Sequence, residues 1–159
     1  LEELAWLAHD AFCHAKMDRR WSYNERRNDD PKVKHHNLLK DYSELRETDK
    51  ERNRATVRWI PKKLEREGYA VALAGCGKRV ELDDTAKENL AIFEHDIWMK
   101  GKLAAGYVWG PEVSESPKTS PYLVDWSVLD DEFKYVDYQM VEAIPRILAA
   151  AHRIIVKKK

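Results

Sequence analysis

The sequence predicts an all-α fold, mainly helical with short extended segments, in which two helix–loop–helix repeats are related by pseudo-two-fold symmetry. Three observations predict this class. Short motifs recur in the same order in both halves, apolar residues follow helical spacing between them, and a proline falls late in each half. At 159 residues, with 43% hydrophobic residues, the chain is long enough to bury one shared core.

The internal repeat divides the chain. Four short motifs recur in the same order in both halves. They are His9-Asp10 with His95-Asp96, Trp21-Ser22-Tyr23 with Tyr107-Val108-Trp109, residues 38–45 with 123–129, and Ile60-Pro61 with Ile144-Pro145. The first two pairs are 86 positions apart and the last is 84 apart, so the repeats differ by two residues in the loop between. We infer a duplication within a single domain, 1–159. It comprises repeat 1 (1–70), a connector (71–83) and repeat 2 (84–156).

Repeat 1 is expected to contain two helices around a polar loop. Its first helix is predicted from apolar residues at helical spacing between Leu4 and Ala15. The loop covers about residues 19–37. Thr48 with Glu51 then resembles a capping box, and the second helix should end near Gly68.

Repeat 2 is expected to follow the same plan. Thr85 with Glu88 resembles a second capping box, and the last helix is predicted from about residue 131 to 152. Pro61 and Pro145 fall inside the late helices, which indicates a shared kink or a broken helix. Alternating apolar residues between 68 and 82 favour a short extended connector.

The recurring aromatic pairs at the loop entrances are the candidate binding residues. In one interpretation the rings seal the junction between the copies. In the other, the pseudo-two-fold brings Trp21 and Tyr107 together as a clamp for a flat ring such as a purine, while nearby basic residues hold phosphate. The candidate ligand-binding set is Trp21, Tyr23, Tyr107, Trp109, Arg20, Arg26, Lys34 and His36.

These motifs resemble the RyR domain, the repeat found in pairs in the ryanodine receptor and also in prokaryotic proteins. Residues 20–24 stand where the family has Gly-Trp-x-Tyr-Gly, with both glycines replaced, and residues 106–110 keep both glycines but exchange the aromatics. His36-Asn37-Leu38 and Gly68-Tyr69 match later parts of the pattern. The resemblance covers nearly the whole chain and suggests a stand-alone or excised tandem module of prokaryotic type.

The resemblance implies a non-enzymatic binding or regulatory module, because the receptor repeats are non-catalytic cytosolic modules on a large channel. A nucleotide-like small molecule between the repeats is the expected ligand. The alternative is a protein–protein interaction or scaffold module of a larger assembly with no small ligand. An enzyme is the third and weakest possibility.

Catalytic, metal and cofactor sites are not indicated by the residues. His9 and Cys13 share a helical face, but repeat 2 offers only His95 at the corresponding place, so a repeated zinc site is excluded. Residues 75–79, Gly-Cys-Gly-Lys-Arg, lack the spacing of a phosphate-binding loop. Ser43 and Ser127 recur, yet each suits a turn or the start of a helix.

Charge and cysteine content favour a cytoplasmic protein without a membrane segment. The formal net charge is zero, which argues against nucleic acid as a partner, and no apolar run is long enough for a membrane span. The acidic, amphipathic first residues do not resemble a signal peptide. Cys13 and Cys76 are not paired in a CxxC motif and are expected to be reduced thiols. The basic face around Arg54 and Arg58 should be neutralised by nearby glutamates.

Overall fold

The fold is mainly α. The computed structural model describes residues 1–159, of which 52% are helical and 14% lie in strands. The stricter all-α class is not confirmed, because the short strands form three small sheets. No helix is both long and apolar enough to cross a lipid bilayer.

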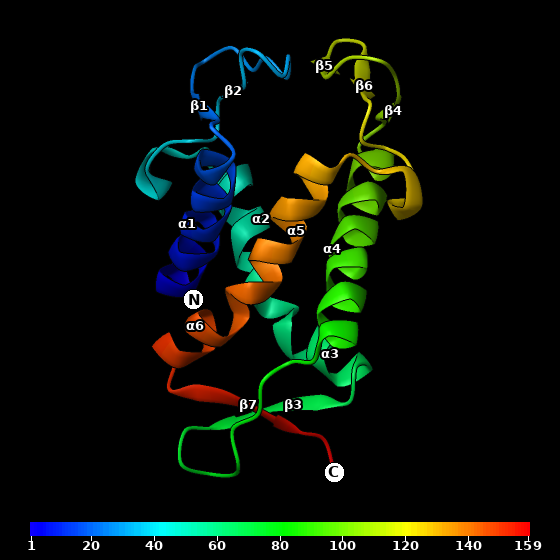
Figure 1. Cartoon of the computed structure of the whole chain (residues 1–159). Coiled ribbons are helices and arrows are strands. Elements are labelled where there is room, and N and C mark those ends of the chain that lie inside the picture. The colour runs from blue at the N-terminus through cyan, green and yellow to red at the C-terminus, as the bar shows by residue number, and fades with distance from the viewer.

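The two copies contain corresponding elements in the same order (Figure 1). The first copy consists of α1 (Glu2–Asp18), β1 (Ser22–Tyr23), β2 (His35–His36), the 3₁₀ helix η1 (Tyr42–Glu44), α2 (Glu47–Arg58), α3 (Ile60–Arg66) and β3 (Tyr69–Leu73). The second consists of α4 (Asp84–Ala104), β4 (Val108–Trp109), β5 (Ser114–Glu115), β6 (Lys118–Ser120), η2 (Trp126–Val128), α5 (Asp131–Glu142), α6 (Ile144–Ala150) and β7 (Arg153–Lys157). Only β5 has no counterpart.

An antiparallel ribbon of β3 and β7 marks the pseudo-two-fold axis. Val71 of β3 lies opposite Ile155 of β7, and these residues are 84 positions apart, the offset of the later motifs. Equivalent residues can face each other across an antiparallel pair only where a two-fold axis passes between them. The extended segment predicted after residue 68 is confirmed as β3, whereas β7 was not predicted.

The polar loops and the ribbon lie at opposite ends of the molecule (Figure 1). Both loops, with β1, β2 and β4–β6, form one end, and the helices run between that end and the ribbon. The symmetry is approximate, because α1 packs against α5 whereas the equivalent helices α4 and α2 barely touch. Among the helices, the seam between the copies is therefore closed mainly along α1 and α5.

The two late helices are broken at the same place. Pro61 and Pro145 are the second residues of α3 and α6, where the missing amide hydrogen removes no helical bond. The predicted kink or break at Pro61 and Pro145 is thus confirmed, whereas the predicted end of the last helix near residue 152 is wrong. α5 stops at Glu142, α6 stops at Ala150, and the chain then turns into β7.

Both predicted capping boxes are also wrong. α2 begins at Glu47 after Arg46, which makes no side-chain cap. At α4 the capping residue is Asp83, whose carboxylate accepts a hydrogen bond from the Ala86 amide at 2.8 Å. Asp83, two residues earlier in the chain, therefore caps the helix in place of Thr85.

One hydrophobic core joins the copies. Its buried members come from all six α-helices, the connector and the ribbon, and they include Ala8, Ile60, Leu64, Tyr69, Leu90, Ile144, Ile147 and Ile155. Because residues from both repeats fill the same core, neither copy buries its apolar face alone.

A buried histidine in each copy ties the first helix to the loop. The Nε2 atom of His9 lies 2.7 Å from the carbonyl oxygen of Lys40, and that of His95 lies 2.7 Å from the carbonyl oxygen of Val124. The recurrence of the His-Asp motif in both copies thus reflects a structural role, in which each histidine orients its loop by a hydrogen bond.

Replacing His95 by leucine is expected to destabilise the fold by about 1–3 kcal/mol, because the Val124 carbonyl would lose its donor in a fully buried place. Urea denaturation measures this change. The exposed His14, replaced by leucine, is the matched control and should leave the midpoint unchanged. Equal urea midpoints for both variants would show that the hydrogen bond from His95 to the Val124 carbonyl contributes nothing to stability.

Candidate functional site

The inner aromatic residue of each loop packs on a lysine. Lys16 Nζ lies 4.1 Å from the Trp21 ring centre, and Lys102 Nζ lies 4.3 Å from that of Tyr107. These lysines are equivalent in the two copies. Trp21 is only 6% exposed. Cation–π contact is thus a repeated structural feature of the loop base.

Two of the remaining candidate residues, Lys34 and Arg20, contribute to the structure of the first loop. Lys34 Nζ donates to the Arg19 carbonyl oxygen at 2.9 Å and to Glu132 of α5 at 3.2 Å. Its equivalent, Lys118, donates to the Ala105 carbonyl oxygen at 2.8 Å. Arg20 adopts a left-handed backbone with φ 69°, at the position where the second copy has a glycine.

His36 is a buried, neutral ring. Its Nδ1 atom accepts a hydrogen bond from the Leu38 amide at 3.1 Å. Burial, together with the charges of Arg27 and Lys16, lowers the pKa of His36 to about 2. His36 therefore has no positive charge to offer a phosphate.

The outer aromatic residues face solvent. Tyr23 is 47% exposed and Trp109 is 58% exposed, and the side chain of Arg26 is exposed as well. Because residues two apart on an extended segment lie on one face, Trp21 and Tyr23 are predicted to share a face, but they differ in burial. No aromatic contact joins the pair of one copy to the pair of the other. The two loops thus present one exposed ring each, with exposed basic side chains in the first loop, at the same end of the molecule (Figure 1).

The first loop docks on the second copy through a carboxylate. Asp29 accepts a hydrogen bond from the Tyr122 hydroxyl at 2.5 Å and pairs with Arg27 at 2.7 Å. Together with the Lys34–Glu132 ion pair, this contact holds the loop against repeat 2. From the sequence alone Asp29 is predicted to be an ordinary loop acid, because its partner Tyr122 is 93 positions away.

Charged side chains are buried in the seam between the copies. Lys16 of α1 is 5% exposed, Lys63 of α3 is 2% exposed and Asp137 of α5 is 9% exposed. Lys63 forms an ion pair with Glu94 of α4. We call the group of Lys16, Lys63, Glu94, Glu132 and Asp137 the seam cluster.

Burial shifts the acid–base behaviour of the seam cluster. Burial, together with the neighbouring Glu94 carboxylate, raises the pKa of the Asp137 carboxyl to about 8. Burial also lowers the pKa of the Lys16 ammonium to about 8. Both groups thus titrate near neutral pH, unlike exposed aspartate and lysine.

Several polar atoms beside the seam have no partner within the chain. Trp21 Nε1, Glu132 Oε2 and Asp137 Oδ2 are buried without a hydrogen bond. Buried polar groups in proteins are nearly always hydrogen-bonded, so these three atoms are exceptional within the fold. A polar residue inside an apolar helical stripe was the available signal, since Asp137 lies four residues from both Phe133 and Val141.

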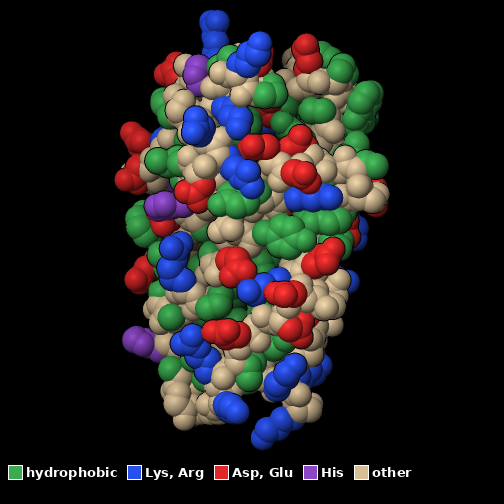
Figure 2. All heavy atoms as spheres, viewed as in Figure 1, with side chains coloured by type: hydrophobic (Ala, Val, Ile, Leu, Met, Phe, Trp, Pro, Cys, Tyr) green, Lys and Arg blue, Asp and Glu red, His purple; other side chains and the backbone are tan.

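The side chains do not assemble a metal site. No group of three or more His, Cys, Asp or Glu residues converges in the structure. Ser43 and Ser127 cap turns, since each donates to the aspartate two residues earlier. On the face shown in Figure 2, acidic and basic side chains are interleaved over the helices. Arg54 pairs with Glu2, Glu47 and Glu51, so the expected neutralisation of that basic row is confirmed.

The fold and the seam define a mainly helical, tandem-repeat module whose copies bury charge between them. A family model described as the RyR domain matches the chain twice, over residues 1–73 and 80–156. The chain therefore belongs to the RyR domain family and carries a tandem pair, as its motifs indicate. A comparison with individual curated proteins found no match.

Proposed function

We propose that this RyR-domain pair is a non-enzymatic, regulatory module that senses a nucleotide-like small molecule between its two copies. The observation that carries the proposal is the set of unpartnered buried atoms of Trp21, Glu132 and Asp137 beside Lys16. They offer donors and acceptors in the inter-copy seam, at the end where both loops lie. The two repeats would act as one ligand-binding domain, in the cytoplasm.

The exposed rings would supply stacking. Tyr23 and Trp109 occupy equivalent positions in the two loops and are the solvent-facing members of each aromatic pair. Base–aromatic stacking contributes about 1–3 kcal/mol per base. Arg20 and Arg26 are exposed nearby in sequence and suit phosphate oxygens. Trp21, Lys34 and His36 would shape the site rather than grip the ligand, since each is engaged in the fold.

Thermal unfolding in the presence of ATP and related nucleotides at millimolar concentration tests the proposal. A ligand that binds only the folded chain raises the melting temperature. Tyr23→Ala and Trp109→Ala should each weaken binding by about 5- to 100-fold, because each removes one stacking surface. Trp21→Ala is unsuitable as a probe, because removing a buried tryptophan costs about 3–5 kcal/mol of stability by itself.

Trp59→Ala is the matched control, because Trp59 is 42% exposed and lies at the α2–α3 junction, away from the loops. It should leave nucleotide affinity unchanged. The proposal fails if no nucleotide stabilises the wild-type protein. It also fails if Trp59→Ala and the two loop variants lose affinity equally.

A protein-interaction or scaffold role is the second candidate. It is supported by exposed apolar side chains on repeat 2, namely Leu103, Val108, Trp109 and Val128, which are 56–72% exposed. Exposed apolar surface of this kind favours protein contact. Indifference to every nucleotide, together with retention of a partner that Val108→Asp releases, would favour this role.

A further inference from the structure

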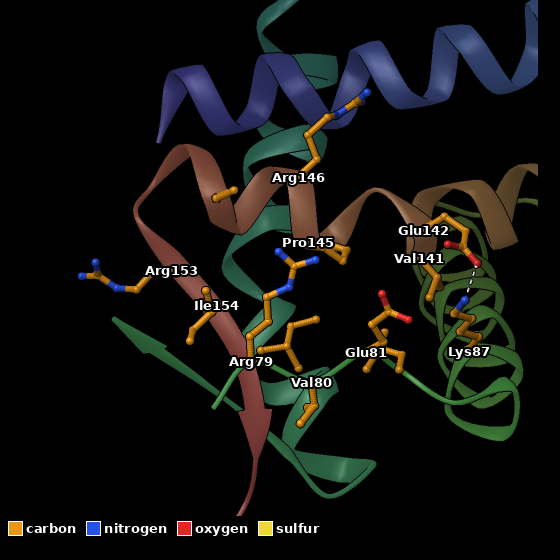
Figure 3. Close-up of a pocket in the computed structure, with 13 residues that line it drawn as sticks. Arg79, Val80, Glu81, Lys87, Val141, Glu142, Pro145, Arg146, Arg153 and Ile154 are labelled. Carbon is orange, nitrogen blue, oxygen red and sulfur yellow. Dashed lines mark ion pairs between the residues drawn. The ribbon is translucent and has the colours of Figure 1, made fainter. Parts of the chain in front are cut away.

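A cavity near the ribbon, far from the loops, has the features of a second ligand site. Its volume is about 450 Å³, within the range of pockets that hold small organic molecules. The connector forms one wall, and α6, β7 and the ends of α4 and α5 form the others (Figure 3). We call it the base cavity.

The floor of the base cavity is apolar. Leu82, Val141 and Ile155 are among its lining residues, and they are 7%, 1% and 3% exposed. Pro145 and Ile154 extend this surface. A ligand with an apolar body would therefore remove hydrophobic surface from water on both sides of the contact.

Most of the charged groups around the cavity are already engaged. Lys87 pairs with Glu142 at 2.9 Å. Arg146 lies 3.6 Å from Asp10 of α1, and Figure 3 shows its side chain directed toward that helix. The side chain of Arg153 points away from the cavity in the same view.

Two opposite charges on the connector remain free. Arg79 and Glu81 are exposed, and neither makes an ion pair or a side-chain hydrogen bond within the chain. Their side chains both rise from the connector toward α6 (Figure 3). One guanidinium and one carboxylate thus face an apolar floor without neutralising each other.

We infer that the base cavity binds a small zwitterion with an apolar body, of the amino-acid or dipeptide type. Arg79 holds the ligand carboxylate by paired hydrogen bonds, and Glu81 accepts hydrogen bonds from its ammonium group. The apolar side chain of the ligand lies on Leu82, Val141 and Ile155. A triphosphate fits poorly, because the Glu81 carboxylate repels added negative charge.

This site is independent of the proposed nucleotide site. The base cavity adjoins β7, whereas the aromatic loops lie at the opposite end of the helices (Figure 1). Either site can therefore fail without the other, and different variants report on each.

Titration calorimetry with L-phenylalanine and leucyl-leucine tests the inference. Phenylpropionate, which lacks the ammonium group, and phenethylamine, which lacks the carboxylate, serve as paired analogues. The zwitterions should bind the wild-type protein, and each analogue should bind about 10- to 100-fold more weakly, since each loses one charge-assisted contact.

Arg79→Gln should weaken binding of phenylalanine and phenylpropionate but leave that of phenethylamine unchanged. Glu81→Gln should show the reverse pattern. Ala149→Phe, which fills the cavity from an exposed position, should abolish binding of all probes. Arg153→Gln is the control for a charge that points away, and it should behave as the wild-type protein.

Absence of heat for both zwitterions at 10 mM would overturn the inference, and so would equal affinity for a zwitterion and its two analogues. Binding that survives Ala149→Phe would place the ligand elsewhere and overturn it as well. Nucleotide stabilisation should be unchanged in Arg79→Gln and Glu81→Gln, which separates this test from that of the loop site.

Discussion

Replacing Lys63 by isoleucine is expected to destabilise the fold by about 3–5 kcal/mol, because it leaves the Glu94 carboxylate buried without its cation. The Glu94 side chain is only 16% exposed, so water cannot fully take the place of the ammonium group. Chemical denaturation of the purified variant measures the loss.

The second copy supplies the compensating change. Ile147 occupies the position equivalent to Lys63, 84 residues on, and Ala8 occupies the position equivalent to Glu94, 86 residues back. Both are core residues. The double variant Lys63→Ile with Glu94→Ala should therefore recover most of the lost stability, since a buried ion pair can often be replaced by apolar side chains.

A double-mutant cycle measures the coupling energy between Lys63 and Glu94. A coupling energy near zero would show that Lys63 and Glu94 do not depend on each other. Lys158, which pairs with Glu65 at the surface, is the control, because Lys158→Ile should change stability little.

Replacing Asp137 by asparagine should make the protein less sensitive to rising pH. The folded pKa of Asp137 is about 8, far above the 3.8 of an ordinary aspartate, because the carboxyl is buried near Glu94. The folded state therefore binds the proton more tightly than the unfolded state. Its stabilising effect is complete below pH 4 and is lost as pH rises through 8.

The difference in unfolding free energy between Asp137→Asn and the wild-type protein should grow by about 1 kcal/mol per pH unit from pH 5 to 7. Asparagine keeps the shape but carries no titrating proton, and Asn53 is its natural equivalent in repeat 1. Denaturation curves at several pH values give this difference directly.

Two neighbouring groups do not disturb the measurement. The pKa of Lys16 is lowered to about 8, so its contribution changes mainly above that pH. The pKa of His36 is lowered to about 2, which affects wild type and variant alike below pH 6.5 and cancels in the difference. Exposed Asp131→Asn should give a flat difference. A flat line for Asp137→Asn as well would contradict burial of its carboxyl.

The duplication could be predicted from the sequence because short local motifs recur in both halves. The recurring histidine–aspartate and isoleucine–proline pairs gave the two copies, their order and the broken helices. β7 escaped prediction, since residues 153–157 continue an apolar pattern that suits a helix as well as a strand. Its strand form depends on β3, which lies more than 80 positions earlier.

The seam cluster could not be predicted from spacing. Lys16 and Lys63 have charged neighbours in the sequence, where a further charge is usually solvated, and only Asp137 gives a local signal, because it interrupts an apolar stripe. Their burial results from the packing of one copy against the other. The outer aromatic residues Tyr23 and Trp109, by contrast, were predictable as loop residues. Only the difference in burial between Trp21 and Tyr23 could not be predicted from the sequence.

The β3–β7 ribbon makes each half of the chain incomplete. A single copy would end in one strand with no neighbour, and it could satisfy that strand only by crossing to a second molecule of itself. Fusion of two such copies turns an encounter between separate molecules into a permanent intramolecular one, so assembly no longer depends on protein concentration. Within one chain the two halves can also differ. The seam therefore holds the Lys63–Glu94 ion pair on one side and the apolar counterparts Ile147 and Ala8 on the other.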